Sequence, residues 1–526
     1  MIKPHRIAIL INQTLELPAW EIESIKKVRD SGLATIETFI ISGYPSEMKE
    51  GFSLRLFQKF ENWWFGSMPD AFRKSSVKNE FPGVRIIDTR DEKKISELDL
   101  DLIYSSCLIS HSREAEFYAK YGLWYINFGS AEYVGSEPVG FWEVMNDTTE
   151  IGSSLNVKLP SEGVITVYQG TTTTVPYSVK NTFNSIAWKA SSFFQYRLHE
   201  LSQSGGELFF RKYKNQKRLL PEESYKIFKP PGSVKLIGLF TRNVFRYIIN
   251  KFTQTFSKKR FTLLFSQQEF KIPEIDFSKF TPLKLPDGVF WADPFLVQKD
   301  QKNYIFFEEY VYKKNKAHIS VLEIKSDGSN SDPTIILDKP YHLSYPFVFQ
   351  VDNVYYMVPD SNSNKTVELY KCTQFPDKWE FVENLMEDIS LIDSTLLYYE
   401  NKWWLFGNNP ANSFTSTNDQ LFLYSSENLF SSTWKPHPQN PVATLISNCR
   451  PAGKIFQLAG KLYRPAQNNS SKQYGYGIKI NEIEVLNETE YREKEMFEIR
   501  PDKTNQLSAV HTINFINNLI VIDGIV

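Results

Sequence analysis

Cysteine is scarce in this chain of 526 residues, which has only Cys107, Cys372 and Cys449. The three lie far apart in the sequence, so no two have the spacing of a metal-binding pair, and their odd number argues against a disulfide framework. The sequence therefore predicts no metal site, identifies no cofactor, and favours a reducing, cytoplasmic location.

Long apolar runs are missing as well. The N-terminal segment MIKPHRIAILINQ holds an apolar run of only about five residues, which is typical of a buried strand rather than a signal peptide. No window approaches the roughly 20 apolar residues of a membrane span. Charge of one sign is also missing, because 60 basic and 61 acidic side chains give a net charge of −1. That balance disfavours a nucleic-acid partner.

Aromatic residues, in contrast, are abundant at 15% of the chain, so a large core can be buried. The segment 290–309, FWADPFLVQKDQKNYIFFEE, has the pattern of two strands joined by a polar turn. The same pattern recurs at 345–360, 393–408, 450–467 and 511–524. Five hairpins of one type, spaced roughly 50–60 residues apart, predict a five-bladed β-propeller with one sheet per repeat.

The first half of the chain has a different pattern. Short apolar strands alternate with helical segments from Arg6 to Phe128, which predicts a doubly wound α/β sheet. The expected organisation is an α/β domain over 1–205, a helical linker over 206–264 and the propeller over 265–526. An aromatic-rich, helical insert at about 50–80 is expected to pack against the sheet, an interpretation favoured over ligand binding.

Residues 121–170 resemble the formyltransferase fold of methionyl-tRNA and sugar N-formyltransferases. The matching residues are Asn127 at a strand end, Tyr133, Gly135 and Pro138 in a loop, Phe141, Trp142 and Glu143 at a helix start, and Gly152. The resemblance covers roughly 1–200 and implies that Asn127 binds substrate. Formyl transfer needs groups for the amine proton and the oxyanion. However, Gly129 holds the family's His position, and 161–163 (Ser-Glu-Gly) stands where its Asp belongs. We therefore expect a degenerate domain, kept for packing or binding, rather than retained formyl transfer.

The segment 234–261 has apolar residues at helical spacing, with most of its basic residues off that stripe. A basic amphipathic helix can lie on an anionic membrane surface, giving peripheral membrane contact. The alternative, that the stripe packs on the propeller between the two domains, is favoured because such stripes ordinarily mark core contact.

Several polar residues start the first strand of a predicted blade, and these strands line a propeller's central channel. Asp293, the segment 342–345 with His342 and Tyr345, Asp393, Arg450 and His511 should therefore meet at one end of the axis. Together with Trp291, they would suit a sugar or a sugar phosphate in an axial funnel. A polar plug that fastens the blades together is an equally weighted alternative.

Two of these segments, Trp291-Ala292-Asp293-Pro294 and Ile392-Asp393-Ser394, resemble acidic signatures of the five-bladed glycosidases. The resemblance implies that Asp293 and Asp393 are catalytic, as base or nucleophile and as substrate-holding group. Glycoside hydrolysis needs a second carboxyl group as acid. Arg450 stands at the blade where that Glu belongs, which argues against a hydrolase and for an anion such as phosphate. Glu308 or Glu309 could still supply the acid.

The chain as a whole is similar to the N-terminal region of the glucosamine inositolphosphorylceramide transferase family. The similarity is carried by 140–144 (GFWEV), 290–295 (FWADPF), 342–349 (HLSYPFVF), 450–456 (RPAGKIF) and 461–467 (KLYRPAQ). It implies a free-standing bacterial protein of cell-surface glycan biosynthesis, with a glycosyltransferase as partner. The main hypothesis is a carbohydrate-active protein that binds or processes a sugar or sugar phosphate. The alternatives are an active formyl or acyl transferase on an amino-sugar nucleotide, and a scaffold for glycan enzymes.

Overall fold

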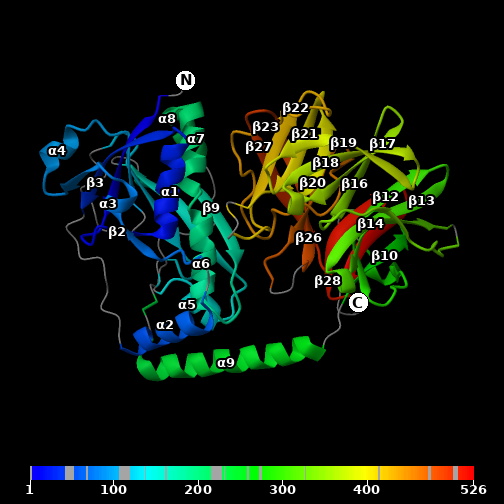
Figure 1. The fold of residues 1–526 in the computed structure, drawn as a ribbon, viewed down its shortest axis with the longest axis horizontal. Helices are drawn as coiled ribbons and strands as arrows, with labels where there is room; N and C mark the ends of the chain where they lie inside the picture. Colours follow the sequence, from blue (N-terminus) through cyan, green and yellow to red (C-terminus); the bar gives the residue numbers. More distant parts are fainter. Residues whose placement is uncertain are drawn as a thin grey trace. The chain divides into compact units, whose positions relative to one another are not determined.

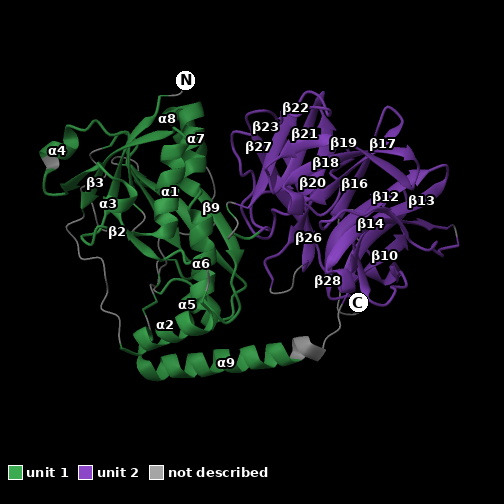
Figure 2. Cartoon of the chain, in the orientation of Figure 1, with its two compact units in different colours: residues 1–255, 411–416 green, residues 256–410, 417–526 purple. Residues whose placement is uncertain are grey.

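A computed structural model describes most of the chain. The described residues are 3–41, 52–66, 69–105, 119–134, 136, 138–159, 163–214, 228–229, 231–256, 260–271, 275–325, 327–410, 412, 415–471, 475–501 and 507–525. The chain divides into two compact units (Figure 2). Unit 1 comprises 1–255 and 411–416, and unit 2 comprises 256–410 and 417–526. Within these described ranges, no helix has the length and apolar character needed to cross a membrane.

Unit 1 is built on a seven-stranded sheet with the order β5-β3-β1-β6-β7-β8-β9. The first five strands in this order are parallel, and β8 and β9 extend the sheet as an antiparallel hairpin. The strand bounds are β1 His5–Ile11, β3 Ala34–Ile41, β5 Arg85–Asp88, β6 Leu102–Ser105, β7 Leu123–Phe128, β8 Glu150–Leu159 and β9 Gly163–Thr173. The expected α/β region is thereby confirmed, while its kinship with formyltransferases stays a prediction.

Helices cover this sheet because its strands are apolar on both faces. Ile7 and Ile9 of β1 join one core cluster and Ala8 joins another, as expected of a buried parallel strand. The first cluster holds α1, α6, α7 and α8 on one face of the sheet. The helices of unit 1 are α1 Ala19–Asp30, α2 Phe52–Trp64, α3 Val77–Glu80, α4 Glu92–Ser96, α5 Phe141–Met145, α6 Val179–Ala190, α7 Phe193–Ser204, α8 Gly206–Lys214 and α9 Ser233–Phe256. A short ribbon of β2 (Glu16–Pro18) and β4 (Lys74–Ser76) completes the unit.

Unit 2 is the five-bladed propeller that the hairpin repeat predicts (Figure 1). Its described residues form five four-stranded sheets. Blade 1 is β12 Val289–Lys299, β13 Lys302–Val311, β14 Lys316–Ile324 and β15 Thr334–Leu337, and blade 2 is β16 Ser344–Val351, β17 Val354–Ser361, β18 Thr366–Gln374 and β19 Lys378–Glu387. Blade 3 is β20 Ile392–Tyr399, β21 Lys402–Asn408, β22 Leu421–Ser426 and β23 Lys435–Pro436, and blade 4 is β24 Phe456–Leu458, β25 Lys461–Asn468, β26 Gly477–Leu486 and β27 Tyr491–Ile499.

Blade 5 closes the ring, because it joins strands from both ends of unit 2. It consists of β28 Ala509–Ile516, β29 Leu519–Ile525, β10 Phe261–Gln267 and β11 Thr281–Pro282. Strand β10 pairs antiparallel with β29 along its whole length, from Phe261 opposite Ile525 to Gln267 opposite Leu519. The ring is therefore held by main-chain hydrogen bonds between segments about 260 residues apart in sequence.

Candidate functional site

The inner strands carry β-bulges at matching positions. The pairing of β12 with β13 shifts between Ala292 and Phe295, and β16, β20 and β28 shift at the corresponding places. Asp293, Tyr345 and Asp393 begin three of these bulges with positive φ angles of 51°, 43° and 53°. A bulge re-aims the side chain it carries, and non-glycine residues with positive φ concentrate at functional or highly constrained positions.

The bulges bring together a set of polar side chains that we call the axial group. It consists of Asp293, Glu308, His342, Tyr345, Asp393, Arg450, His511 and Asp523, and its members contact or electrostatically influence one another. Asp293 and Asp393, 100 residues apart in sequence, lie close enough for each charge to affect the other. The members of the axial group come from four blades and from the segment before β24. The sequence therefore predicted most of the residues that meet here.

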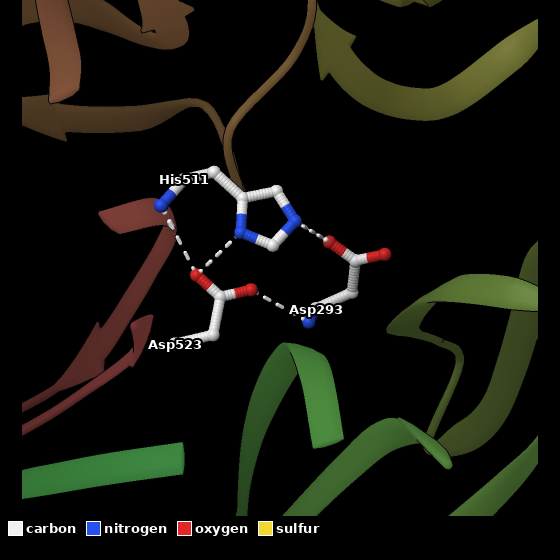
Figure 3. A group of neighbouring side chains, drawn as sticks. All are labelled: Asp293, His511 and Asp523. Atoms are coloured by element: carbon white, nitrogen blue, oxygen red, sulfur yellow. Dashed lines mark hydrogen bonds and ion pairs between the residues drawn. The ribbon is translucent and has the colours of Figure 1, made fainter. Parts of the chain in front are cut away.

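The centre of the axial group is an imidazole held between two carboxylates (Figure 3). His511 Nε2 lies 3.3 Å from Asp293 Oδ1, and its Nδ1 lies 2.9 Å from Asp523 Oδ1. Asp523 also accepts backbone N–H bonds from His511, Thr512 and Asp293. Burial disfavours a charge on His511, but Asp523 and Asp293 raise its pKa to about 10. His511 is thus an imidazolium at neutral pH and joins blade 5 to blade 1.

These three side chains could also hold a metal ion, since their ligand atoms all lie within 4.8 Å of one another. In the observed arrangement, both imidazole nitrogens of His511 already face carboxylate oxygens. A metal ligand must be a neutral imidazole, whereas this environment favours the protonated form. The His511 imidazolium and a metal ion are therefore alternative sources of positive charge at this position.

Both carboxylate oxygens of Asp293 accept hydrogen bonds, in addition to the contact with His511. Its Oδ1 accepts from Thr512 Oγ1 at 2.9 Å, and its Oδ2 accepts from the Tyr345 N–H at 3.3 Å. Burial works against its charge, yet the hydrogen bond and the charge of His511 lower the pKa of Asp293. Asp293 is 3% exposed and ties blades 1, 2 and 5 together as a carboxylate.

Asp393 pairs with Arg450. Arg450 Nε donates to Asp393 Oδ2 at 2.5 Å, Nη2 donates to Oδ1 at 3.3 Å, and Nη1 donates to Asn418 Oδ1 at 2.8 Å. The Asp393 N–H donates to Asp360 Oδ2. Burial raises the pKa of Asp393 to about 7, although Arg450 opposes this. Asp393, which was expected to be catalytic, has a fully buried side chain that orients Arg450.

The side chain of Tyr345 contacts neighbouring blades near the propeller axis. Its ring packs edge-on against Phe295 of blade 1 at 4.8 Å. Its hydroxyl lies 3.0 Å from Thr395 Oγ1 of blade 3 and accepts from the Gly453 N–H of the segment leading to blade 4. Tyr345 is fully buried and reaches four blades, so it forms a floor rather than the substrate-facing wall that the sequence suggested.

Glu308 and His342 form the remaining part. His342 Nε2 lies 3.3 Å from Glu308 Oε1, while His342 Nδ1 accepts from the Ala317 N–H. That backbone donor leaves the proton of a neutral His342 on Nε2, facing Glu308. Burial, followed by the charge of Asp293, raises the pKa of Glu308 well above its usual range, which favours the protonated form. Burial also lowers the pKa of His342.

Two predicted site residues lie elsewhere. Trp291 is 1% exposed in a hydrophobic cluster of unit 2, where its ring packs on Phe307 and its Nε1 donates to Glu309. Its role as a sugar-binding wall is therefore corrected to a core residue. Asn127 is buried at the end of β7 in unit 1, opposite Ser154. It belongs to a different unit from the axial group.

Sequence reasoning missed Asp523, Asn418 and Thr512. Asp523 has the same role as Asp360 of β17 in blade 2. Each accepts a hydrogen bond from the bulge N–H of the next blade. An Asp near the end of the second strand was therefore the available signal. Asn418 and Thr512 carried no comparable signal, since Asn and Thr are common in loops and strands.

The comparisons with known proteins concern mainly unit 2. The family described as "Glucosamine inositolphosphorylceramide transferase 1, N-terminal" matches residues 280–510. Proteins named glucosamine inositolphosphorylceramide transferase 1 from Oryza sativa subsp. japonica and Arabidopsis thaliana are both 36% identical, over 207 and 228 residues. These matches cover 39% and 43% of this chain, and 27% and 29% of the relatives. The chain thus spans less than a third of the length of these curated relatives.

Solved structures similar to this chain include a family 117 glycoside hydrolase from Zobellia galactanivorans, at 12% identity and a TM-score of 0.31 over 45% of this chain and 74% of that one. Another is an exo-1,5-alpha-L-arabinanase from a bovine ruminal metagenomic library, at 9% identity and a TM-score of 0.32 over 44% and 93%. A likeness of this degree carries no conclusion about activity.

Proposed function

We propose that unit 2 binds a sugar or sugar phosphate at the part of the axial group formed by Glu308, His342 and Arg450, and that the chain serves cell-surface glycan biosynthesis. The observation that carries this proposal is Glu308, a buried carboxyl group with a raised pKa and no fastening role, which feels the charge of the partly exposed Arg450. The name of the plant relatives, which contains an amino sugar and a phosphoryl group, supports the same ligand class.

The blade repeat explains why Glu308 is available. Glu308, Asp360 and Asn408 occupy the same register on the second strands of blades 1, 2 and 3. Asp360 fastens its blade to the next by accepting the Asp393 N–H. The corresponding N–H for Glu308 is that of Tyr345, which donates to Asp293 instead. Glu308 is thereby released from fastening and keeps a proton that it can donate to a hydroxyl or phosphate oxygen.

Arg450 supplies the positive charge for an anionic ligand. Its side chain is 16% exposed, whereas that of its partner Asp393 is fully buried. Asp393 and Asn418 fix the guanidinium, and a fixed planar fork matches phosphate geometry. His342, with 34% of its side chain exposed, lies 3.3 Å from Glu308. The three side chains present a cation and two hydrogen-bond donors to one ligand.

Substituting Arg450 by alanine should weaken the binding of a sugar phosphate by about 10- to 150-fold, because a lost hydrogen bond to a charged group costs about 1.5–3 kcal/mol. Titration calorimetry with a panel of sugar phosphates, nucleotide sugars and free sugars measures this effect and tests the proposal itself. Arg450→Lys, which keeps a charge beside Asp393, should lose part of the affinity and retain the fold.

The matched control is Arg492→Ala, since Arg492 is an exposed residue of β27 with surface ion pairs. It should leave affinity unchanged. A lowered melting temperature of Arg450→Ala with unchanged affinity would show that Arg450 only fastens blades 3 and 4. Absence of binding by any sugar phosphate in the panel would refute the proposed ligand class.

A second candidate function is the transfer of a glycosyl group. It is favoured because the pKa values of two carboxyl groups are shifted in opposite directions. Burial and Asp293 raise the pKa of Glu308, while His511 keeps the pKa of Asp293 low against burial. Carboxyl groups whose pKa values are pushed apart are typical of general acid–base sites. In this function Glu308 would protonate the leaving oxygen, Arg450 would bind a phosphate, and a glycosyltransferase would be the partner.

Unit 1, in contrast, should not transfer formyl groups. A Cβ on Gly129 would lie 2.8 Å from the Tyr133 carbonyl oxygen and 2.9 Å from Val134 Cα, and its φ of 121° disfavours any side chain. The position therefore has no room for the family's His, while residues 160–162, where part of its Asp segment falls, lie outside the described residues. Incubation with formyl-tetrahydrofolate and amino-sugar nucleotides should give no turnover. Repeated turnover that Asn127→Ala abolishes would contradict this expectation.

A further inference from the structure

Helix α9 in unit 1 has apolar side chains on two faces. Its inner stripe, Leu236, Leu239 and Phe240, packs into a cluster with Leu54 and Phe57 of α2 and with residues of α5. The sequence favoured packing of this stripe on the propeller, and its observed place within unit 1 corrects that expectation. The inner stripe explains how α9 is held, but it leaves the opposite face of the helix unexplained.

The opposite face of α9 is an outer stripe of exposed apolar residues. Its members lie at positions that share one side of the helix and are between 47% and 87% exposed: Val234, Ile237, Phe245, Ile248, Ile249 and Phe252. Large apolar groups in water cost free energy in proportion to their area, so a contiguous stripe of this kind marks an interaction surface.

Helix α2 lies alongside α9 and adds to the same kind of surface (Figure 1). The rings of Phe57 and Phe60 contact Phe240 at 5.9 and 4.9 Å, and Ser233 bonds Ser53. Phe52, Leu56, Trp63 and Trp64 of α2 are all more than half exposed. The aromatic insert was expected to pack against the sheet, but only part of its apolar surface is covered.

The charges on the two helices are of one sign. Arg55 and Lys59 lie on α2, and Lys235, Arg242, Arg246 and Lys251 lie on α9. The only acidic residue in either helix is Glu61, which is 3% exposed and accepts the Lys180 N–H. The exposed charged residues within the two helices are therefore all basic, although Arg246 pairs with Asp147, whose side chain is 45% exposed.

A hollow of about 280 Å³ opens between the helices. Aromatic rings form most of its lining, including Phe60 and Trp64 of α2 and Phe240 and Tyr247 of α9, with Glu61 and Asn243 as its polar members. Trp64 packs edge-on against Tyr247 at 6.5 Å, so the hollow has an aromatic rim. A hollow of this composition would admit an acyl segment of a lipid.

We propose that α2 and α9 together form a docking surface for an anionic membrane. Tryptophan and phenylalanine beside lysine and arginine, with no exposed acid, is the composition of helices that lie in a bilayer interface. Long basic side chains extend toward phosphate headgroups while apolar side chains enter the acyl boundary. A docking surface for a protein would not require both helices to lack exposed acidic residues. This proposal is independent of the sugar site in unit 2.

The test is co-sedimentation of the full chain with phosphatidylcholine vesicles, with and without phosphatidylglycerol. The wild type should bind the anionic vesicles, and binding should weaken as salt is added. Ile248→Glu should reduce partitioning about tenfold or more, because it places a charge in the apolar stripe. The matched control is Ile335→Glu on β15, since Ile335 and Ile248 are 53% and 55% exposed. It should bind like the wild type.

Three results would overturn the proposal. The first is failure of the wild type to bind anionic vesicles, and the second is an equal loss in both variants. The third is a concentration-dependent dimer, seen by light scattering, that Ile248→Glu disperses while vesicle binding is absent. This last result would assign the surface to a second copy of the chain. Both side chains are more than half exposed, so both variants should keep a melting temperature close to that of the wild type.

Discussion

Replacing His511 with glutamine should lower the free energy of unfolding of the propeller by about 3–5 kcal/mol, the cost of removing one partner from a buried charge pair. The substitution would leave Asp293 and Asp523 facing each other without the cation that lies 3.3 and 2.9 Å from their oxygens. Both carboxyl groups are buried, so water cannot compensate them. Urea unfolding followed by circular dichroism measures the loss.

The loss of stability caused by His511→Gln should depend on pH. The carboxylates raise the pKa of His511 from 6.5 to about 10 against the effect of burial. A raised pKa in the folded state means that this stabilisation is complete below pH 6.5 and disappears as the pH rises toward 10. The difference in stability between wild type and His511→Gln should therefore shrink across that interval.

His342→Gln serves as the control, because His342 contacts a single carboxyl group and is 34% exposed on its side chain. Its cost should stay below about 1 kcal/mol, as for a partly solvated interaction. An equal cost for both substitutions, or a pH-independent difference for His511→Gln, would show that the imidazole contributes packing rather than charge.

Glu308→Gln should reduce turnover of a glycosyl donor by about 10²–10⁴-fold, the usual contribution of a general acid, if unit 2 transfers the sugar that it binds. Burial and Asp293 raise the pKa of Glu308, so activity should persist to a higher pH than an ordinary glutamic acid would allow and then fall as Glu308 ionises. Glutamine has the shape of the neutral acid but no transferable proton. Rates measured with phosphate-linked sugars across a pH series test both expectations.

The adjacent residue provides the matched control. Glu309 accepts hydrogen bonds from Ser320 and Trp291 and lies 3.1 Å from His318 Nε2. Burial would raise its pKa, but these partners lower it, so Glu309 is a structural carboxylate. Glu309→Gln should lower stability and leave the pH–rate profile unchanged. Binding without turnover in the wild type would limit unit 2 to sugar recognition.

Much of the fold could be predicted because local pattern and tertiary role agree. The hairpin pattern around 290–309 became β12 and β13, and its four repeats gave the remaining inner hairpins. The apolar segment from Arg6 became β1, and the helical spacing after Leu17 became α1. Strands buried on both faces and alternating hairpins leave strong traces in sequence.

The roles within the axial group were harder to predict, because burial and hydrogen-bond partners decide them. Asp293 and Glu308 are both acidic residues of blade 1, yet Asp293 is ionised by contact with His511 and Glu308 is kept neutral. Trp291, two residues before Asp293, points into the hydrophobic core instead of the axis. Neither residue type nor spacing distinguishes these outcomes.

Helix α9 shows the same limit for surfaces. Its apolar and basic pattern suggested either a membrane helix or a packed one. The structure gives it two apolar stripes, of which only the inner one is packed. The sequence was interpreted as having one apolar stripe, so it could not predict that α9 has a packed and an exposed apolar face.

The closure of the ring in blade 5 has a consequence for the order of assembly during synthesis. Strand β10 is made before the other four blades, but its partner β29 follows all of them. Asp523 lies on β29, so His511 has both of its counter-ions only after this strand has left the ribosome. Until then, the nascent propeller is an open arc in which His511 lacks Asp523 as its second counter-ion. The charged contacts at the centre of the propeller can therefore form completely only after the chain has been translated through β29.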